Sequence, residues 1–197
     1  METQEICWNC KHHLQIKNFF CDNCEKIQSP WDINEFELLG LERKYKIDLD
    51  DLENKYLRLQ QLFHPDKFLN FSEKEKKYST IFSSKINDAY QKIINNSTRA
   101  NILFKALGYE IDLEKKSYDD PEVLEEIMEI QNKCLSIDKK ESKRKILKDL
   151  DQRIEETTEQ LSKSFDDKNY PKAKKLNIKL SYLEKIRKNL KLNNEFN

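Results

Sequence analysis

Apolar side chains recur at intervals of three and four residues along much of the chain, a spacing that lines one face of an α-helix. Two runs follow this spacing: Leu52, Tyr56, Leu59 and Phe63, and then Tyr78, Phe82, Ile86, Ala89 and Ile93. Between the runs, Pro65 cannot continue a helix and pushes the preceding His64 out of the helical conformation. The pattern predicts a helical hairpin with a loop at its tip.

Four further helices are predicted after the hairpin. The first is short, beginning at Ser97 or Thr98 and ending at Leu107, because Gly108 suits a left-handed cap. The next opens at Asp120, an N-cap followed by proline in the first turn. It is the first of three helices expected to form an antiparallel bundle, over about residues 120–135, 139–167 and 171–190.

The composition agrees with this all-α fold. Hydrophobic residues make up 37% of the 197 residues and charged residues another 37%, with only two glycines, which suits helices with one buried stripe and a charged outer face. Ser29-Pro30 marks a boundary before the first helices. We expect three sections: a four-cysteine unit over 1–30, a hairpin domain over 31–110 and a bundle over 111–197.

The charge pattern limits the classes of partner. Lys plus Arg and Asp plus Glu both total 36, so no global field would draw the chain to nucleic acid or to an anionic membrane. No apolar run approaches the roughly 18 residues of a membrane-spanning helix, and residues 1–5 are too polar and acidic for a secretory signal or a basic transit peptide. We therefore expect a soluble chain, processed or lacking a presequence, that binds neither nucleic acid nor membrane.

Four cysteines form two closely spaced pairs near the start of the chain. Cys7 and Cys10 are separated by two residues, as are Cys21 and Cys24, and ten residues lie between the pairs. Four thiolates complete a tetrahedral shell, so the spacing favours a closed structural Zn²⁺ site, with iron-sulphur ligation as the alternative. His12 and His13 are expected in loops, and Cys134 as a small buried hydrophobe. A zinc or thiol enzyme would need an open metal position or an activated thiolate.

The tripeptide His64-Pro65-Asp66 at the hairpin tip resembles the trigger motif of the J-domain. By that resemblance these three residues engage a DnaK-type ATPase chaperone, helped by Lys55 and Arg58 on the first helix, with Asp66 offering a carboxylate to a chaperone arginine. The alternative for the tripeptide is a polar turn, and for the two basic residues a solvated helix face.

The resemblance extends over nearly the whole chain and points to one family. The segments that carry it are Cys7-Trp8-Asn9-Cys10, Phe19-Phe20-Cys21 with Cys24, Phe36-Glu37-Leu38-Leu39-Gly40-Leu41, Leu59 to Phe68, Asn87-Asp88-Ala89-Tyr90, Arg99-Ala100 to Gly108, and Asp120 to Ile130. Together they are similar to the HscB family of iron-sulphur co-chaperones, and above all to its eukaryotic branch, which carries an N-terminal zinc unit.

In that family the C-terminal bundle binds the cluster scaffold through residues of its first and last helices. The matching positions here are Leu124, Met128, Glu129 and Tyr182. Glu125, Gln131 and Asn132 differ from the bacterial residues, so the polar rim is expected to differ too. By periodicity alone, Leu124, Met128 and Tyr182 would instead belong to the bundle core.

The resemblance implies a co-chaperone rather than an enzyme. It is expected to bind an IscU-type iron-sulphur scaffold protein, deliver it to the DnaK-type chaperone and stimulate that chaperone's ATP hydrolysis. A general J-domain co-chaperone for unfolded clients is the alternative, and a zinc or thiol enzyme a further one. The family implies the mitochondrial matrix, with the cytoplasm as the alternative. Both a monomer and a homodimer are left open.

Overall fold

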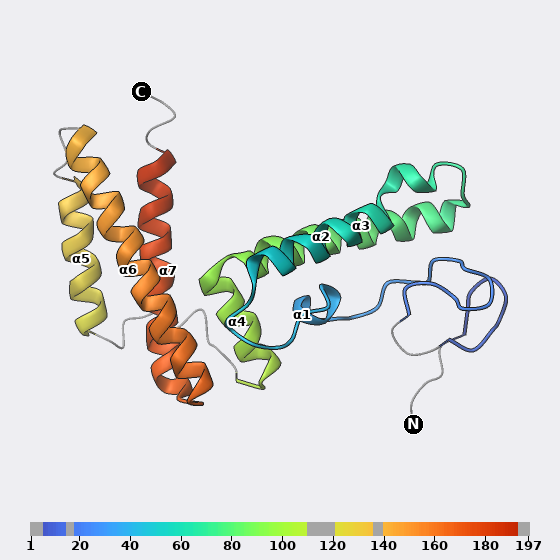
Figure 1. Cartoon of the computed structure of the whole chain (residues 1–197), viewed down its shortest axis with the longest axis horizontal. Coiled ribbons are helices and arrows are strands. Elements are labelled where there is room, and N and C mark those ends of the chain that lie inside the picture. The colour runs from blue at the N-terminus through green and yellow to red at the C-terminus, as the bar shows by residue number, and fades with distance from the viewer. Residues whose placement is uncertain (1–5, 15–17, 110–120, 136–139, 193–197) are drawn as a thin grey trace. The chain divides into compact units, whose positions relative to one another are not determined.

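The computed structural model describes residues 6–14, 18–109, 121–135 and 140–192, and all of its regular elements are helices. Seven α-helices and one 3₁₀ turn follow one another along these residues: α1 (Glu35–Leu38), α2 (Leu49–Phe63), the 3₁₀ turn η1 (Pro65–Phe68), α3 (Glu73–Ile94), α4 (Asn96–Ala106), α5 (Pro121–Leu135), α6 (Lys140–Asp166) and α7 (Tyr170–Leu192). Figure 1 shows their course. The predicted all-α fold is confirmed. The predicted N-cap Asp120 lies outside the described residues.

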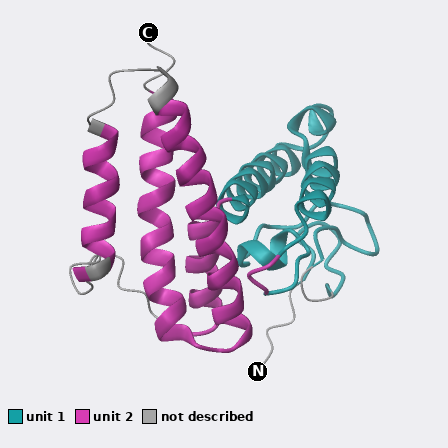
Figure 2. Ribbon diagram, turned by 60° about the vertical axis from the view of Figure 1, so that its left-hand side comes forward, with its two compact units in different colours: residues 1–43, 47–94 teal, residues 44–46, 95–197 magenta. Residues whose placement is uncertain are grey.

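The chain divides into two compact units (Figure 2). Unit 1 comprises residues 1–43 and 47–94, and unit 2 comprises residues 44–46 and 95–197. This division differs from the three predicted sections, and residues 44–46 of the predicted hairpin domain belong to unit 2. The cysteine segment shares unit 1 with the hairpin, and α4 belongs to unit 2 with the bundle.

Unit 1 is built on the hairpin of α2 and α3, which lie side by side in Figure 1. Phe63 on α2 and Phe82 on α3 are fully buried and their rings lie 4.7 Å apart. Tyr56 stacks on Tyr90 at 4.1 Å farther along the two helices. Each pair joins residues on the apolar faces of the two helices, so the predicted helical hairpin is present.

The cysteine segment joins unit 1 because its aromatic side chains complete the hairpin core. Phe19 lies 5.1 Å from Phe63 and 5.3 Å from Phe82, both edge to face. Trp31 contacts Phe82 as well, with ring centroids 5.8 Å apart. These rings cover apolar surface that two helices alone would leave in water. Each Å² of apolar surface buried in this way stabilises the fold by about 25 cal/mol.

Unit 2 contains the predicted three-helix bundle. Its core cluster takes residues from all three helices: Val123, Ile127, Ile130, Leu150, Leu183, Ile186 and Leu190. The bounds of α5, α6 and α7 differ by no more than two residues from the predicted ranges, within the usual variation at helix ends. No described helix is both long and apolar enough to cross a membrane.

Helix α4 is attached to α7 by polar contacts. The Glu184 carboxylate on α7 accepts hydrogen bonds from Ser97 Oγ and, at 3.2 Å, from Asn95 Nδ2. Asn177 Nδ2 on α7 donates to Asn101 Oδ1 at 2.7 Å. The predicted start of this helix at Ser97 or Thr98 is corrected to Asn96, because the N-cap is Asn95. The predicted cap at Gly108 is present, with φ of 78°.

Replacing Asn95 by alanine is expected to destabilise unit 2. The Asn95 Oδ1 atom accepts from Thr98 N at 2.8 Å, a cap bond, and its amide donates to Glu184. We expect Asn95→Ala to lower the free energy of unfolding by about 1–2 kcal/mol in urea denaturation. Asn95→Ser keeps a capping oxygen and should lose less. Equal losses in the two variants would contradict the capping role.

Candidate metal centre and recognition surfaces

Two similar turns carry the four cysteines. In the first, Lys11 N donates to Cys7 O at 3.1 Å, and in the second Glu25 N donates to Cys21 O at 2.8 Å. Lys11 and Glu25 each have positive φ, 62° and 57°, at the same place four residues after the first cysteine of the pair. Short antiparallel bridges, Ile6 with His13 and Phe20 with Ile27, close the two turns. We call them the first and second knuckles, residues 6–13 and 20–27.

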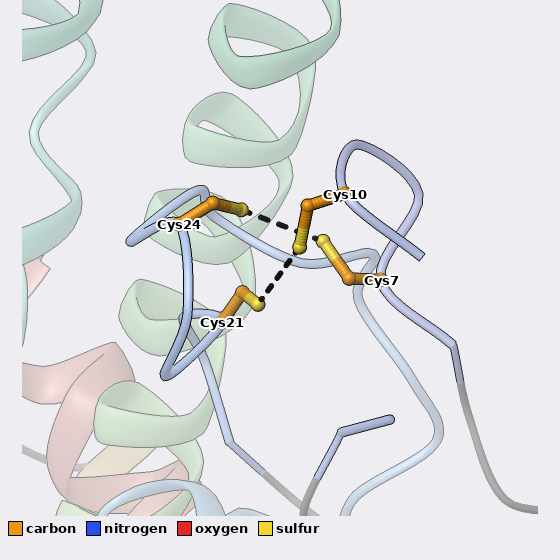
Figure 3. A group of neighbouring side chains, drawn as sticks. All are labelled: Cys7, Cys10, Cys21 and Cys24. Atoms are coloured by element: carbon orange, nitrogen blue, oxygen red, sulfur yellow. Dashed lines mark hydrogen bonds between the residues drawn. The ribbon is translucent and has the colours of Figure 1, made fainter. Parts of the chain in front are cut away.

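The four sulfur atoms point toward one another (Figure 3). All four Sγ atoms lie within 4.8 Å of one another, with Cys7 to Cys24 at 3.6 Å and Cys10 to Cys21 at 3.7 Å. A tetrahedral ion with metal–sulfur bonds of about 2.3 Å sets its ligand sulfurs about 3.8 Å apart. The arrangement therefore fits a single tetrahedral metal ion.

Amide groups donate hydrogen bonds to the Sγ atoms of Cys7 and Cys10, whereas burial raises the pKa of Cys21 to about 11. Asn23 Nδ2 donates to Cys10 Sγ at 3.6 Å, and this bond, with the backbone amide of His12, lowers the pKa of Cys10 to about 6. Gln28 is buried, and its Nε2 donates to Cys7 Sγ at 3.4 Å and to Lys26 O at 2.6 Å. Such donors orient metal ligands, and sequence spacing does not reveal them.

Two histidines and the fifth cysteine are not part of this sulfur cluster. His12 and His13 are exposed, and the metal-ligating group found among the described residues consists of the four cysteines alone. Cys134, predicted as a small buried hydrophobe, packs against the bundle core and is half-buried, and this burial raises the pKa of its thiol.

The predicted trigger tripeptide lies at an exposed corner between α2 and α3. The side chain of His64 is 54% exposed and that of Asp66 78%. His64 Nδ1 accepts a hydrogen bond from the Asp66 backbone amide at 3.3 Å, and Pro65 begins the 3₁₀ turn. Ser79 Oγ on α3 donates to Phe63 O at 3.0 Å, which fixes the last residue of α2. The imidazole and the carboxylate are therefore available to a partner.

The two basic residues predicted beside the tip differ in their contacts. Lys55 pairs with Asp51 on its own helix at 2.7 Å. Arg58 is exposed, and the described residues provide no ion-pair partner for it. The Arg58 guanidinium can therefore pair with an acidic surface of a partner without breaking an existing ion pair. Lys55 would first have to break its ion pair with Asp51.

The predicted scaffold-binding residues of the bundle differ in exposure. Met128 is 55% exposed, Glu129 is exposed and Leu124 is half-buried, and none of the three belongs to the core cluster. Tyr182 on α7 is half-buried and packs against that cluster. Helix α5 therefore presents apolar surface outside the core. Tyr182 is partly exposed and also packs against the core cluster.

A charged network that sequence reasoning missed connects all three helices of the bundle. Glu126 on α5 pairs with Lys179 on α7 at 2.6 Å and with Arg153 on α6 at 2.9 Å. Arg153 also pairs with Asp149, four residues earlier on α6, at 2.9 Å. Only this last pair carries a sequence signal, the i,i+4 spacing. The network ties α5 to the other two helices between Leu124 and Met128.

Comparison with known proteins identifies the family. The family model described as "HSCB C-terminal oligomerisation domain" matches residues 119–191. A relative from Mus musculus, "Iron-sulfur cluster co-chaperone protein HscB", is 32% identical over 190 residues, covering 94% of this chain and 81% of the relative. An Arabidopsis thaliana homologue of the same name is 30% identical over 185 residues, covering 93% of this chain and 72% of the relative.

A solved structure is similar over the same extent. The crystal structure of human co-chaperone protein HscB has a TM-score of 0.88 and 30% sequence identity, and the match covers 96% of this chain and 98% of that one. Sequence and fold therefore agree across both units, including the segment that carries the cysteines. The chain belongs to the HscB family of iron-sulphur cluster co-chaperones.

Proposed function

We propose that this protein binds an IscU-type iron-sulphur scaffold protein, delivers it to a DnaK-type chaperone and stimulates that chaperone's ATP hydrolysis. The observation that supports this most directly is the exposed His64 and Asp66 pair at the corner of the hairpin. The family membership supports the iron-sulphur role in particular over a general role with unfolded clients.

The tip would act as the trigger through charge-assisted hydrogen bonds. The Asp66 carboxylate, 78% exposed, can accept two parallel bonds from a chaperone arginine. His64 holds the Asp66 backbone amide through Nδ1, which aligns the two side chains. Arg58, exposed on α2, would add a contact to acidic residues of the chaperone, and Lys55 a weaker one because of its pairing with Asp51.

The scaffold would bind through the exposed apolar surface of α5. Met128 and Leu124 lie one turn apart, with Glu129 as an acidic neighbour and Tyr182 contributing from α7. Apolar anchors of this kind carry most of the binding free energy in small interfaces. Holding scaffold and chaperone on one chain turns their encounter into an intramolecular step at raised effective concentration. The co-chaperone itself would make and break no covalent bond.

The metal in the knuckles is proposed to be Zn²⁺ in a closed structural site. Four thiolates satisfy tetrahedral zinc without an open position for water, so the site would stabilise the knuckles rather than perform catalysis. The single-ion geometry argues against a cluster, which spreads its ligands over two or more irons. By family resemblance we further propose the mitochondrial matrix as the compartment.

Zinc should bind with one ion per chain and depend on Gln28. We expect native mass spectrometry to detect one Zn²⁺ and Gln28→Leu to weaken zinc binding about tenfold in competition with a chelating dye, because a donor to Cys7 Sγ is lost. Gln61→Leu, on the exposed face of α2, is the matched control. Iron in place of zinc, or unchanged affinity in Gln28→Leu, would contradict the proposal.

Removing the imidazole should abolish stimulation of the chaperone. We expect His64→Gln to reduce the increase in chaperone ATP turnover by about tenfold or more, the effect of about 1.4 kcal/mol of lost interaction. The circular dichroism spectrum should not change, because the His64 side chain is 54% exposed. Exchanging His13, exposed in the first knuckle, for glutamine is the control. Normal turnover with His64→Gln would refute the trigger.

Truncating the proposed scaffold surface should weaken scaffold binding and leave stimulation of the chaperone intact. The triple change Leu124→Ala, Met128→Ala and Tyr182→Ala is expected to raise the Kd for the scaffold about 100-fold in titration calorimetry. Chaperone stimulation in the absence of scaffold should persist. A Met128→Ala single variant guards against loss of folding, because its side chain lies outside the core. Unchanged scaffold affinity in both variants would count against this surface.

A further inference from the structure

The second knuckle contacts both helix ends that flank the tip tripeptide. Phe20 and Lys26 lie on its two arms, joined by the backbone hydrogen bond from Cys21 N to Lys26 O at 3.0 Å. Phe20 reaches the last residue of α2, and Lys26 reaches the first turn of α3. The tip loop, residues 64–72, is therefore held at its start and at its end by one small turn.

The first contact is a stack of two aromatic rings. Phe20 lies parallel to Phe63, with centroids 5.5 Å apart and an interplanar angle of 9°. Phe63 is fully buried and immediately precedes His64 in the chain. Since a buried ring sets the direction of its own backbone, the stack determines where the chain leaves α2 and enters the tip.

The second contact is an ion pair with a buried carboxylate. Glu75 is 2% exposed, and Lys26 Nζ lies 3.1 Å from its Oε1 and 3.2 Å from its Oε2. The same carboxylate accepts hydrogen bonds from Ser72 N at 3.2 Å and from Ser72 Oγ at 2.7 Å, a capping box that begins α3. Burial would raise the pKa of Glu75, but the bonds from Ser72 and Lys26 outweigh it and lower that pKa.

Lys26 is needed there because an isolated buried carboxylate is costly. Without the ammonium group, Glu75 would have to bind a proton or move into water. Either change weakens its bonds to Ser72, which ends the tip loop. The charge of Lys26 thereby acts on the tip although the residue is far from His64 in sequence.

We propose that Lys26 and Phe20 are positioning residues of the chaperone trigger, which hold the loop of residues 64–72 in the arrangement that presents His64 and Asp66. This inference rests on the trigger role proposed above for those two residues. It gives the metal unit a task in the same activity, because the second knuckle, residues 20–27, carries both positioning side chains. Losing either Lys26 or Phe20 should leave a smaller fraction of molecules in which the tip presents His64 and Asp66 to the chaperone.

The test compares two lysine variants on a zinc-loaded full chain. Lys26→Met keeps the aliphatic stem and removes the charge that meets buried Glu75. Lys76→Met is the matched control, because Lys76 is similarly exposed, 38% against 36%, but pairs with the 90% exposed Glu73. The probe is a purified DnaK-type chaperone with ATP, titrated with each variant. Native mass spectrometry verifies that zinc is retained.

Positioning predicts a specific pattern of effects. In Lys26→Met the half-activating concentration should rise about fivefold with maximal stimulation nearly unchanged, because only about a fifth of the molecules would be competent before binding. Amide hydrogen exchange over residues 66–72 should quicken about tenfold, and the His64 ring signals should shift in NMR spectra. Lys26→Arg should restore all three, and Lys76→Met should change none. Phe20→Leu, which alters no charge, should repeat the Lys26→Met pattern.

The outcomes separate this inference from the proposed function. The proposed function stands if the wild type stimulates the chaperone and His64→Gln does not. The inference about Lys26 is then wrong if zinc-loaded Lys26→Met has a normal half-activating concentration and normal amide exchange in the tip. Faster exchange spread evenly over α2 and α3 would assign Lys26 a purely structural role and also overturn it. If wild type itself fails to stimulate, the function is wrong, and tip exchange alone then decides whether Lys26 orders the loop.

Discussion

Unit 1 depends on the burial of Phe63 at the end of α2. A pair of helices has too little core to hold itself together, and here Phe19 and Phe20 of the cysteine segment add to the contact between Phe63 on α2 and Phe82 on α3. Two of these four rings come from the cysteine segment. With the proposed metal bound by the four cysteines, the free energy of metal binding would add to the stability of the hairpin through these ring contacts. The folding of the knuckles and the geometry of the tip are coupled through this one cluster.

The same cluster explains how an exposed corner can be well ordered. The tip must leave His64 and Asp66 in water, and exposed loops with few buried contacts usually open easily. In this chain the constraint lies on either side of the exposed residues: Phe63 is buried before them and Glu75 after them. The contacts on either side of the tip therefore constrain its backbone, and within the tip His64 Nδ1 accepts a hydrogen bond from the Asp66 backbone amide at 3.3 Å.

Local sequence signals were sufficient for helices α2 to α7 and for the grouping of the four cysteines, but not for the short helix α1 or for how the parts pack. The spacing of Phe82 and Ile86 and the two cysteine pairs act over a few residues, where geometry follows directly from periodicity. The ion pair of Lys26 with Glu75 spans 49 positions, and the contact of Ser97 with Glu184 spans 87. Lysine, serine and glutamate are usually exposed, so nothing in their type marks them as buried partners. The Ser72 to Glu75 spacing did carry a capping-box signal for the start of α3.

The two proposed recognition surfaces rely on different physical forces, and this suits sequential delivery. The tip offers a carboxylate and an imidazole, and α2 adds the exposed Arg58; the electrostatic contacts of such groups speed encounter and weaken as salt rises. The α5 surface offers Met128 and part of Leu124, apolar groups whose burial mainly slows dissociation. A cargo held by apolar contacts stays bound through many brief electrostatic encounters with a chaperone. An adaptor that must retain one partner while repeatedly meeting another needs this division of forces between its two ends.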